Sequence, residues 1–294
     1  VKQGGKINAV GTPDKPIVMT SEKEEPGAWG GIHICGRAHT NAEGGKGSSE
    51  IGGAVYGGND DADNSGTLQY IRLEYTGFAF DEEHEANGIS FYGVGNGTIV
   101  DHCQAYKGSD DGFEFFGGSV NVSNLVAVSC SDDSFDWTEG WNGKGTNLVA
   151  YQEDKSTLGY DCDCLMECDN NGSNNAATPV AHPVLKNLIL VGNGGSKQGI
   201  RLRAGTEVEI DNAKVCGKGQ PLTVETALTE NALKNGTSKL TNITLTSELS
   251  SKEGIYTHAD FIAVTSNKVD ANLSYSSFED IRKECSWMNG SWVK

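Results

Sequence analysis

Two short patterns recur along this chain every 20 to 25 residues or so, and this recurrence restricts the possible folds more than any other feature. The first pattern has a polar residue, a small residue and then alternating apolar and polar residues that include an aromatic ring. It occupies residues 87–93, 111–117 and 133–139, which start 24 and then 22 residues apart, and residues 199–205 repeat its alternation. Alternation with a period of two, bounded by Gly or Asp, predicts short β-strands.

The second pattern is an asparagine followed by strand-forming apolar residues. It begins at Asn124, Asn147, Asn187, Asn212 and Asn242, and the successive spacings are 23, 40, 25 and 30 residues. An asparagine side chain tolerates a tight bend and can stack on an asparagine one coil away. The two patterns predict an all-β chain, a right-handed parallel β-helix of about 11 to 13 coils of ~23 residues, about 4.8 Å apart. We expect one domain over residues 1–294, with its long loops on one face.

Several further segments carry a family resemblance. They are residues 11–18, 26–31, 56–58, 63–68 and 87–95, together with the two Ser-Asp-Asp segments at 109–111 and 131–133. On these residues the chain resembles the pectate-lyase-like right-handed parallel β-helix superfamily. More narrowly, it resembles bacterial secreted or surface-anchored β-helix proteins of unsettled function. The resemblance implies the fold and an extracellular or cell-surface location, as in an adhesin.

Composition limits the partners. The chain has 40 acidic and 23 basic residues and a formal net charge of −17, which disfavours nucleic acid and anionic membrane surfaces. No run approaches the ~18 apolar residues of a membrane span, so we expect no membrane insertion. Such a surface suits cations or uncharged substrates. The chain starts at Val1 within strand-like sequence, and we therefore expect a mature form whose targeting segment has been removed.

Eight cysteines in an acidic, polar chain indicate an oxidising compartment and predict up to four disulfides. Buried free thiols are the alternative, notably at Cys103. Cys162, Cys164 and Cys168 have C-x-C-x3-C spacing, which lacks the C-x2-C pair of common zinc sites. We predict that these three do not bind zinc and that at least one of them is disulfide-bonded.

Alignment of the first repeat places acidic residues in two columns. Glu114 and Asp136 follow Ser90 in one outward column, and Asp111 and Asp133 follow an asparagine in the other. Carboxylates about 4.8 Å apart on adjacent coils repel one another unless a cation, a basic partner or water compensates. Oxygen ligands in register suit Ca²⁺, so Asp111, Glu114, Asp133 and Asp136 are the predicted ligands. A solvated acidic ladder is the alternative.

Two other sites are weaker candidates. Asp61 and Asp63 belong to a D-x-D-x-S-G sequence that begins like an EF-hand loop, but position twelve is Arg72 rather than glutamate. These aspartates predict either another kind of Ca²⁺ loop or a simple turn. Among the tryptophans, Trp141 is the candidate for an exposed platform that contacts glycan.

Three functions remain open. The leading interpretation is a non-catalytic extracellular protein that binds Ca²⁺ and contacts a polysaccharide, surface glycan or matrix. The resemblance also implies a Ca²⁺-dependent polysaccharide lyase with Arg201 as the base, or a hydrolase. For the hydrolase, Asp110-Asp111 and Asp132-Asp133 resemble the catalytic Asp-Asp element, although the companion motifs are missing. The third possibility is a structural subunit that self-associates through its solenoid ends.

Overall fold

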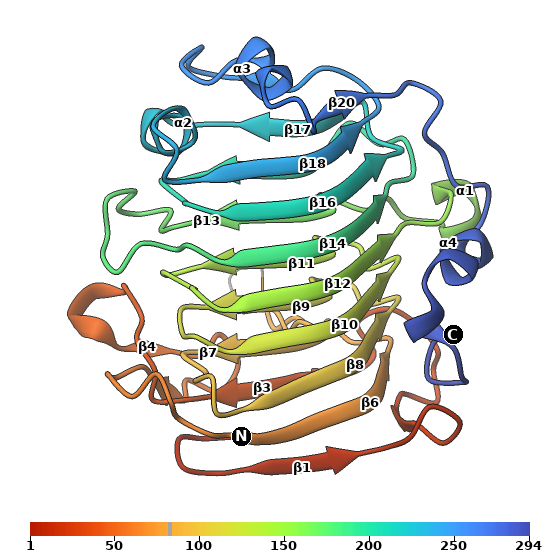
Figure 1. Cartoon of the computed structure of the whole chain (residues 1–294). Helices are drawn as coiled ribbons and strands as arrows, with labels where there is room; N and C mark the ends of the chain where they lie inside the picture. The colour runs from red at the N-terminus through yellow and green to blue at the C-terminus, as the bar shows by residue number, and fades with distance from the viewer. Residues whose placement is uncertain (82–83) are drawn as a thin grey trace.

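The computed structural model describes residues 1–81 and 84–294 and forms a coiled stack of β-strands (Figure 1). Each turn of the chain contributes one strand to a front sheet and one to a back sheet, and both sheets are parallel. The predicted all-β parallel β-helix is therefore confirmed. The front sheet of the described chain stacks nine strands in order, and β2 also pairs with β6. Nine strands correspond to fewer coils than the 11 to 13 predicted, because long excursions between coils use many residues.

The strands of the front sheet are mostly seven to nine residues long. They are β1 (Ile7–Val10), β2 (Ile17–Met19), β6 (Gly66–Glu74), β8 (Ile99–Tyr106), β10 (Asn121–Val128), β12 (Lys144–Tyr151), β14 (Val184–Val191), β16 (Glu209–Cys216), β18 (Lys239–Leu245) and β20 (Lys268–Val269). Five of them, β10, β12, β14, β16 and β18, carry the asparagine repeat.

The strands of the back sheet are shorter and carry the aromatic repeat. They are β3 (Ile32–Cys35), β7 (Ile89–Tyr92), β9 (Phe113–Phe116), β11 (Phe135–Thr138), β13 (Met166–Asp169), β15 (Gln198–Arg203), β17 (Gln220–Val224) and β19 (Ser250–Ser251). A small antiparallel hairpin joins β4 (Gly47–Ser48) to β5 (Val55–Tyr56).

Short helices lie in the excursions between coils. They are α1 (Lys155–Leu158), α2 (Ala227–Lys234), α3 (His258–Ala263) and α4 (Phe278–Glu284), with 3-10 turns at Glu43–Gly45 and Ser286–Met288. In Figure 1 the β4 hairpin and α2 project on the left, whereas α1 and α4 lie on the right, so the excursions occupy more than one face. None of the described helices is long and apolar enough to cross a membrane.

The core fills the space between the two sheets. Phe91 stacks on Phe115 with ring centroids 4.9 Å apart, and Phe113 stacks on Phe135 at 5.6 Å. All four rings are at most 2% exposed, as the inward columns of the sequence predict. Because the inward positions are apolar, the intervening residues of the back sheet must point outward, which places the acidic positions on its outer face.

The predicted asparagine ladder is present at the bend inside the front strands. Asn147 donates its side-chain amide to the Asn124 side chain at 2.8 Å and accepts the amide of Asn187 at 3.0 Å. Asn212 continues the ladder onto Asn187, whereas the amide of Asn242 turns to Asp211 instead. All five ladder asparagines have φ between 56° and 65°, a left-handed conformation that asparagine tolerates better than most residues.

The C-terminal segment packs against the outer face of the front sheet. Ile281, Met288 and Trp292, all fully buried, contact an apolar cluster that includes Val126 and Val149 of the strands. The segment continues to the first coils, where the Ser291 amide donates to the Pro13 carbonyl at 2.8 Å. In Figure 1 this segment lies beside the right-hand ends of the front strands, and the remainder of the front sheet faces the viewer uncovered.

Candidate metal centre

The strand register of the back sheet aligns acidic side chains from coil to coil. Glu114 is paired with Ser90 on one side and with Asp136 on the other. Asp136 is paired in turn with Glu167, and Glu167 with Arg201. The predicted outward column is therefore confirmed, and it contains three carboxylates on three successive coils before a positive charge follows.

A second set of carboxylates lies in the turns that precede these strands. Asp110 and Asp111 precede β9, Asp132 and Asp133 precede β11, and Asp163 precedes β13. The backbone amide of Asp133 donates to the Asp111 carboxylate at 2.8 Å, and the amide of Cys164 donates to the Asp133 carboxylate at 2.6 Å. Each turn thus fixes the carboxylate of the coil below, and the turn aspartates stack in register.

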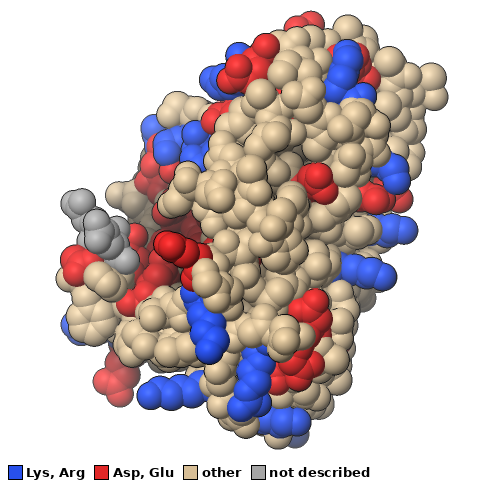
Figure 2. All heavy atoms as spheres, turned by 90° about the vertical axis from the view of Figure 1, so that its left-hand side faces the viewer, with Lys and Arg blue, Asp and Glu red and all other residues tan. Residues whose placement is uncertain are grey.

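These columns converge on a hollow of about 260 Å³, and every described residue that lines it is acidic. Figure 2 shows Asp and Glu atoms gathered in a hollow toward the left of the view. The ten lining residues are Glu50, Glu85, Asp110, Asp111, Glu114, Asp132, Asp133, Asp136, Asp163 and Glu167. We call this hollow the carboxylate pocket.

Burial makes the charged form of these groups costly. It raises the pKa of Asp110 to about 7 and the pKa of Asp132 to about 6, and repulsion from neighbouring carboxylates adds to both shifts. Burial, followed by the same repulsion, also holds the pKa values of the four predicted ligands well above the usual carboxyl range; these are Asp111, Glu114, Asp133 and Asp136.

Among the described residues, the ion pairs to the carboxylates of the three coils lie at one end of the pocket. Of the eight carboxylates carried by the three coils, Asp163 pairs with Lys197, and Glu167 pairs with Arg201 at 2.9 Å and with Arg203. The other six have no ion-pair partner among the described residues. Asn87 donates an amide to Glu114, but no such donor from the described residues reaches Asp136. Buried carboxylates without counter-charges require protons or cations.

The donor set fits a hard divalent cation. Asp111, Glu114 and Asp136 can each direct an oxygen to a common point, with ligand atoms within 4.8 Å of one another, and Asp133, Asp136 and Glu167 can do the same. Asp136 belongs to both triads, so its carboxylate could bridge two ions on adjacent coils. Carboxylate oxygens in a flexible arrangement are the ligands that Ca²⁺ takes in proteins.

Arg201 lies beside the pocket but is engaged elsewhere. Its guanidinium also contacts the Glu225 carboxylate at 3.2 Å, and its pKa is raised by the hydrogen bond to Glu225, although burial opposes this. A guanidinium held between two carboxylates retains its proton, so this geometry does not favour Arg201 as a general base.

Asp61 and Asp63 lie outside the carboxylate pocket. The Asp61 carboxylate accepts the backbone amide of His39 at 3.1 Å and contacts the His39 ring at 2.7 Å. The Asp63 carboxylate accepts the backbone amide of Arg37 at 2.9 Å. Both side chains therefore hold a loop that lies more than 20 residues earlier in the chain through its backbone amides, and neither belongs to a described cluster of potential metal ligands.

The prediction that Trp141 forms an exposed platform is wrong. Its side chain is 1% exposed and stacks on Phe115 with ring centroids 4.1 Å apart, while its indole N–H donates to the Val120 carbonyl at 3.1 Å. The coil turns inward after β11, so the ring extends the aromatic core between the sheets. Trp141 cannot contact glycan in this fold.

The disulfide prediction is also wrong, because all eight cysteines are free and buried. They are distributed over separate apolar clusters: Cys103, Cys130 and Cys168 lie in the main core, Cys216 and Cys285 under the C-terminal segment, and Cys35 near Tyr56. Here cysteine serves as a small apolar side chain. Cys162, Cys164 and Cys168 do not form a common metal-ligand group among the described residues, and only Cys164 neighbours acidic ligands.

Reasoning from repeats identified four of the ten pocket residues as ligands and missed six. Asp110 and Asp132 are adjacent to predicted ligands, and their doubled Asp-Asp sequences were the signal for them. Asp163 and Glu167 follow a long excursion that obscures the repeat phase. Glu50 and Glu85 come from loops outside the repeat, and no sequence spacing points to them.

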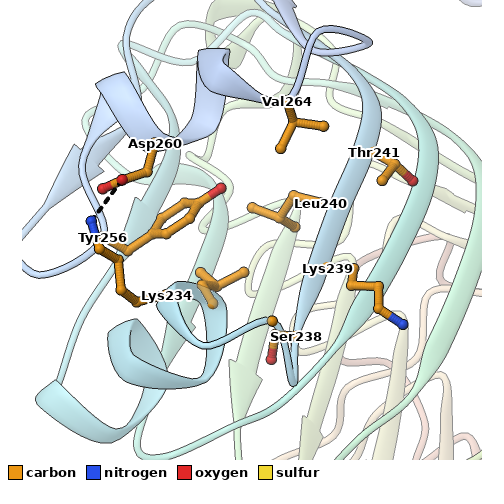
Figure 3. A pocket seen from close by; sticks show the side chains of 10 residues that line it. Lys234, Ser238, Lys239, Leu240, Thr241, Tyr256, Asp260 and Val264 are labelled. Atoms are coloured by element: carbon orange, nitrogen blue, oxygen red, sulfur yellow. Dashed lines mark hydrogen bonds and ion pairs between the residues drawn. The ribbon is translucent and has the colours of Figure 1, made fainter.

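A second hollow of about 310 Å³ lies at the end of the coil stack, between α2, α3 and β18 (Figure 3). Its walls are largely apolar, with Leu240 and Val264 facing Tyr256. Its charged groups all have partners, since Lys234 donates to the Asp260 carboxylate at 2.7 Å and Lys239 contacts the Glu209 carboxylate at 3.6 Å. This hollow therefore offers no set of unpaired ligand groups comparable to the carboxylate pocket.

The chain matches the family described as a pectate-lyase like beta helix domain over residues 1–293. It belongs to that family, as the parallel sheets and the aligned columns indicate. No curated protein and no solved structure shows a significant match to the chain.

Proposed function

We propose that this member of the pectate-lyase-like β-helix family is a non-catalytic, extracellular or cell-surface protein that binds Ca²⁺ in the carboxylate pocket and contacts glycan. The observation that carries the proposal is the pocket itself, with eight carboxylates on three successive coils and only one end compensated by basic side chains. Divalent cations supply the missing positive charge at the lowest structural cost, because the oxygens are already in register.

The geometry supports more than one ion. The two ligand triads that share Asp136 belong to neighbouring coils, and coils of a parallel stack are separated by about 4.8 Å. Two calcium ions at that distance repel each other, and a bridging carboxylate with further carboxylates around it offsets this repulsion. We therefore infer a stoichiometry of at least two Ca²⁺ per chain.

Calorimetric titration of EDTA-stripped protein with Ca²⁺ tests this proposal. We expect two or more ions per wild-type chain and a loss of at least one ion in Asp136→Asn, because this carboxylate serves both triads. Asp14→Asn is the matched control, since Asp14 is exposed and lies outside the pocket. If the wild-type protein takes up no Ca²⁺, or if the two variants titrate alike, the site assignment is wrong.

The non-catalytic part of the proposal is supported by the engagement of Arg201. A lyase requires a base that can accept a proton above the cation, and the ion pairs of Arg201 with Glu167 and Glu225 oppose this role. Incubation of the Ca²⁺-loaded protein with polyuronate, followed by measurement of unsaturated products, distinguishes the two functions. We expect no product, and Ca²⁺-dependent product that is lost in Arg201→Ala would establish the lyase instead.

A proposed extracellular location agrees with a calcium-binding role, because extracellular modules work with Ca²⁺ affinities of about 10⁻⁴ to 10⁻³ M. Fractionation of the native host cells with an antibody to this chain tests the location. We expect the protein in the medium or at the cell surface, and recovery confined to the cytosol would contradict it.

Self-association through the first coil is a second candidate property. Strand β1 pairs with β6 on one side only among the described residues, and Val10 in that strand is 57% exposed. An open strand edge with an exposed apolar residue favours edge-to-edge pairing. Sedimentation of the wild type and Val10→Lys over a concentration series tests it, with dimers expected only for the wild type.

A further inference from the structure

Two exposed phenylalanines lie near the carboxylate pocket. Phe78 is 41% and Phe80 is 69% exposed, and their rings meet edge to face with centroids 5.0 Å apart. Both belong to the segment between β6 and β7 that also carries Glu85 into the pocket. Backbone bonds hold this segment, since Phe78 donates to the Trp29 carbonyl at 3.1 Å and Phe80 to the His84 carbonyl at 2.9 Å.

Phe80 forms one wall of a hollow of about 490 Å³ adjoining the carboxylate pocket. Glu50 lines both spaces, so its side chain lies between them. The tip of the β4–β5 hairpin also lines the hollow, and there Gly52 and Gly53 have positive φ values of 77° and 55°. A Cβ atom on either glycine would meet no atom within 4 Å, so this backbone is open to a ligand. Ser48 adds a hydroxyl group, whereas the Ser49 hydroxyl is buried and held inside the hairpin, where it donates to the Ile51 carbonyl at 2.9 Å and accepts the Ala54 amide at 2.9 Å.

We propose that this hollow is a subsite for one uncharged sugar ring, which stacks its C–H face on the ring of Phe80. The subsite rests on the glycan contact proposed above and specifies its chemistry. A pyranose presents weakly positive C–H hydrogens on one face and hydroxyl groups around its edge. The C–H hydrogens match the negative face of an aromatic ring, and the hydroxyl groups match the open backbone of Gly52 and Gly53 and the Ser48 hydroxyl.

Local charge selects against an acidic sugar in this position. Glu50 lies in the wall of the hollow and belongs to neither ligand triad, so Ca²⁺ in the triads does not pair with it directly; the other ionisable group in the wall, His84, contacts Asp81. A uronate ring stacked on Phe80 would bring a further negative charge toward Glu50, whereas an uncharged ring requires no compensation. Phe80 therefore takes the glycan-contacting role that the sequence suggested for the buried Trp141.

Titration with defined oligosaccharides tests the subsite. The probes are hexasaccharides of glucose, mannose, galactose and galacturonate, each measured by calorimetry in Ca²⁺ and in EDTA. We expect at least one uncharged hexasaccharide to bind the wild-type protein. Its affinity should be about tenfold lower for Phe80→Ala and within about threefold of wild type for Phe80→Trp. Leu228→Ala is the control, because Leu228 is 49% exposed and lies on α2, away from this hollow; its affinity should be unchanged.

The outcomes separate the subsite from the function on which it rests. Binding of an uncharged hexasaccharide with equal affinity to wild type and Phe80→Ala would overturn the subsite and leave glycan contact standing. Binding of the galacturonate probe alone would overturn the uncharged-sugar assignment. If no probe binds, glycan contact and the subsite both fail for these sugars, and the separate Ca²⁺ titration still decides the metal site. Thermal unfolding of Phe80→Ala should match wild type, since the ring is exposed.

Discussion

Removing two stacked charges from the carboxylate pocket should have opposite effects with and without Ca²⁺. The double variant Glu114→Gln/Asp136→Asn retains the shape of both side chains, which are paired across adjacent coils. At an effective dielectric constant of about 20, two carboxylates about 4.8 Å apart repel by roughly 3 kcal/mol. In EDTA at pH 8 the variant should therefore be at least as stable as wild type, although lost hydrogen-bond geometry offsets part of the gain.

With Ca²⁺ present the order should reverse. A cation that binds only the folded chain at a hundredfold excess over Kd stabilises it by about 2.7 kcal/mol. An unfolding entropy of about 2.1 cal/mol/K per residue gives roughly 0.6 kcal/mol/K for 294 residues, so Tm should rise by about 4 °C per such site. The variant should lose this increment.

Scanning calorimetry in EDTA, in Ca²⁺, and in Mg²⁺ and NaCl of matched ionic strength makes the comparison. Asp14→Asn again controls for a simple change in net charge. A wild-type Tm that Ca²⁺ raises no more than NaCl does would refute the reasoning and support a solvated acidic ladder. A double variant much less stable than wild type in EDTA would show that the pocket carboxylates do not repel as the geometry implies.

Three further predictions concern pH, the ladder and the thiols. The pKa values of Asp110 and Asp132 are raised in the folded chain, to about 7 and about 6, so the folded state binds protons more tightly than the unfolded state in this range. The free energy of unfolding, measured with urea in EDTA, should therefore fall from pH 5 to pH 8. The fall should be smaller in Asp110→Asn. Asn147→Ala should lower the free energy of unfolding by about 1–3 kcal/mol, because it removes two ladder hydrogen bonds at a left-handed residue. Asn272→Ala, at an exposed turn, should change this free energy by less than about 0.5 kcal/mol. Equal losses in the two variants would contradict the ladder's role. Denatured protein should titrate as eight thiols without reductant and retain no stoichiometric zinc, and fewer thiols would show that disulfides form.

The fold was predictable because the repeat carries its own register. A parallel coil places equivalent residues above one another, so spacings of 24 and 22 residues fix which side chains meet without any knowledge of the loops. The same property revealed the column of Glu114 and Asp136 and the asparagine ladder. Periodic sequence therefore predicts periodic structure, including the part of the site that repeats.

The remainder of the site could not be predicted because it depends on contacts outside the repeat. Glu50 and Glu85 reach the pocket from excursions of irregular length, and their positions follow from how those loops pack on the coils. Trp141 directly follows the turn residue Gly140, where sequence pattern alone does not decide between core and surface. The even number of cysteines suggested disulfides, but pairing requires a specific geometry that residue counts do not reveal, and all eight cysteines are free, six of them packed as apolar side chains in three clusters.

The ends of the acidic column explain why the pocket spans only three coils. Toward the N-terminus the column position is Ser90, which is uncharged, and toward the C-terminus it is Arg201, which neutralises Glu167 together with Arg203. A longer run of carboxylates would add repulsion with every coil, while the arginines confine the uncompensated charge to the coils of β9 and β11. The ions should therefore bind first around Asp111, Glu114 and Asp136, at the end of the pocket farthest from the arginines and nearest to Glu50 and the hollow beside Phe80.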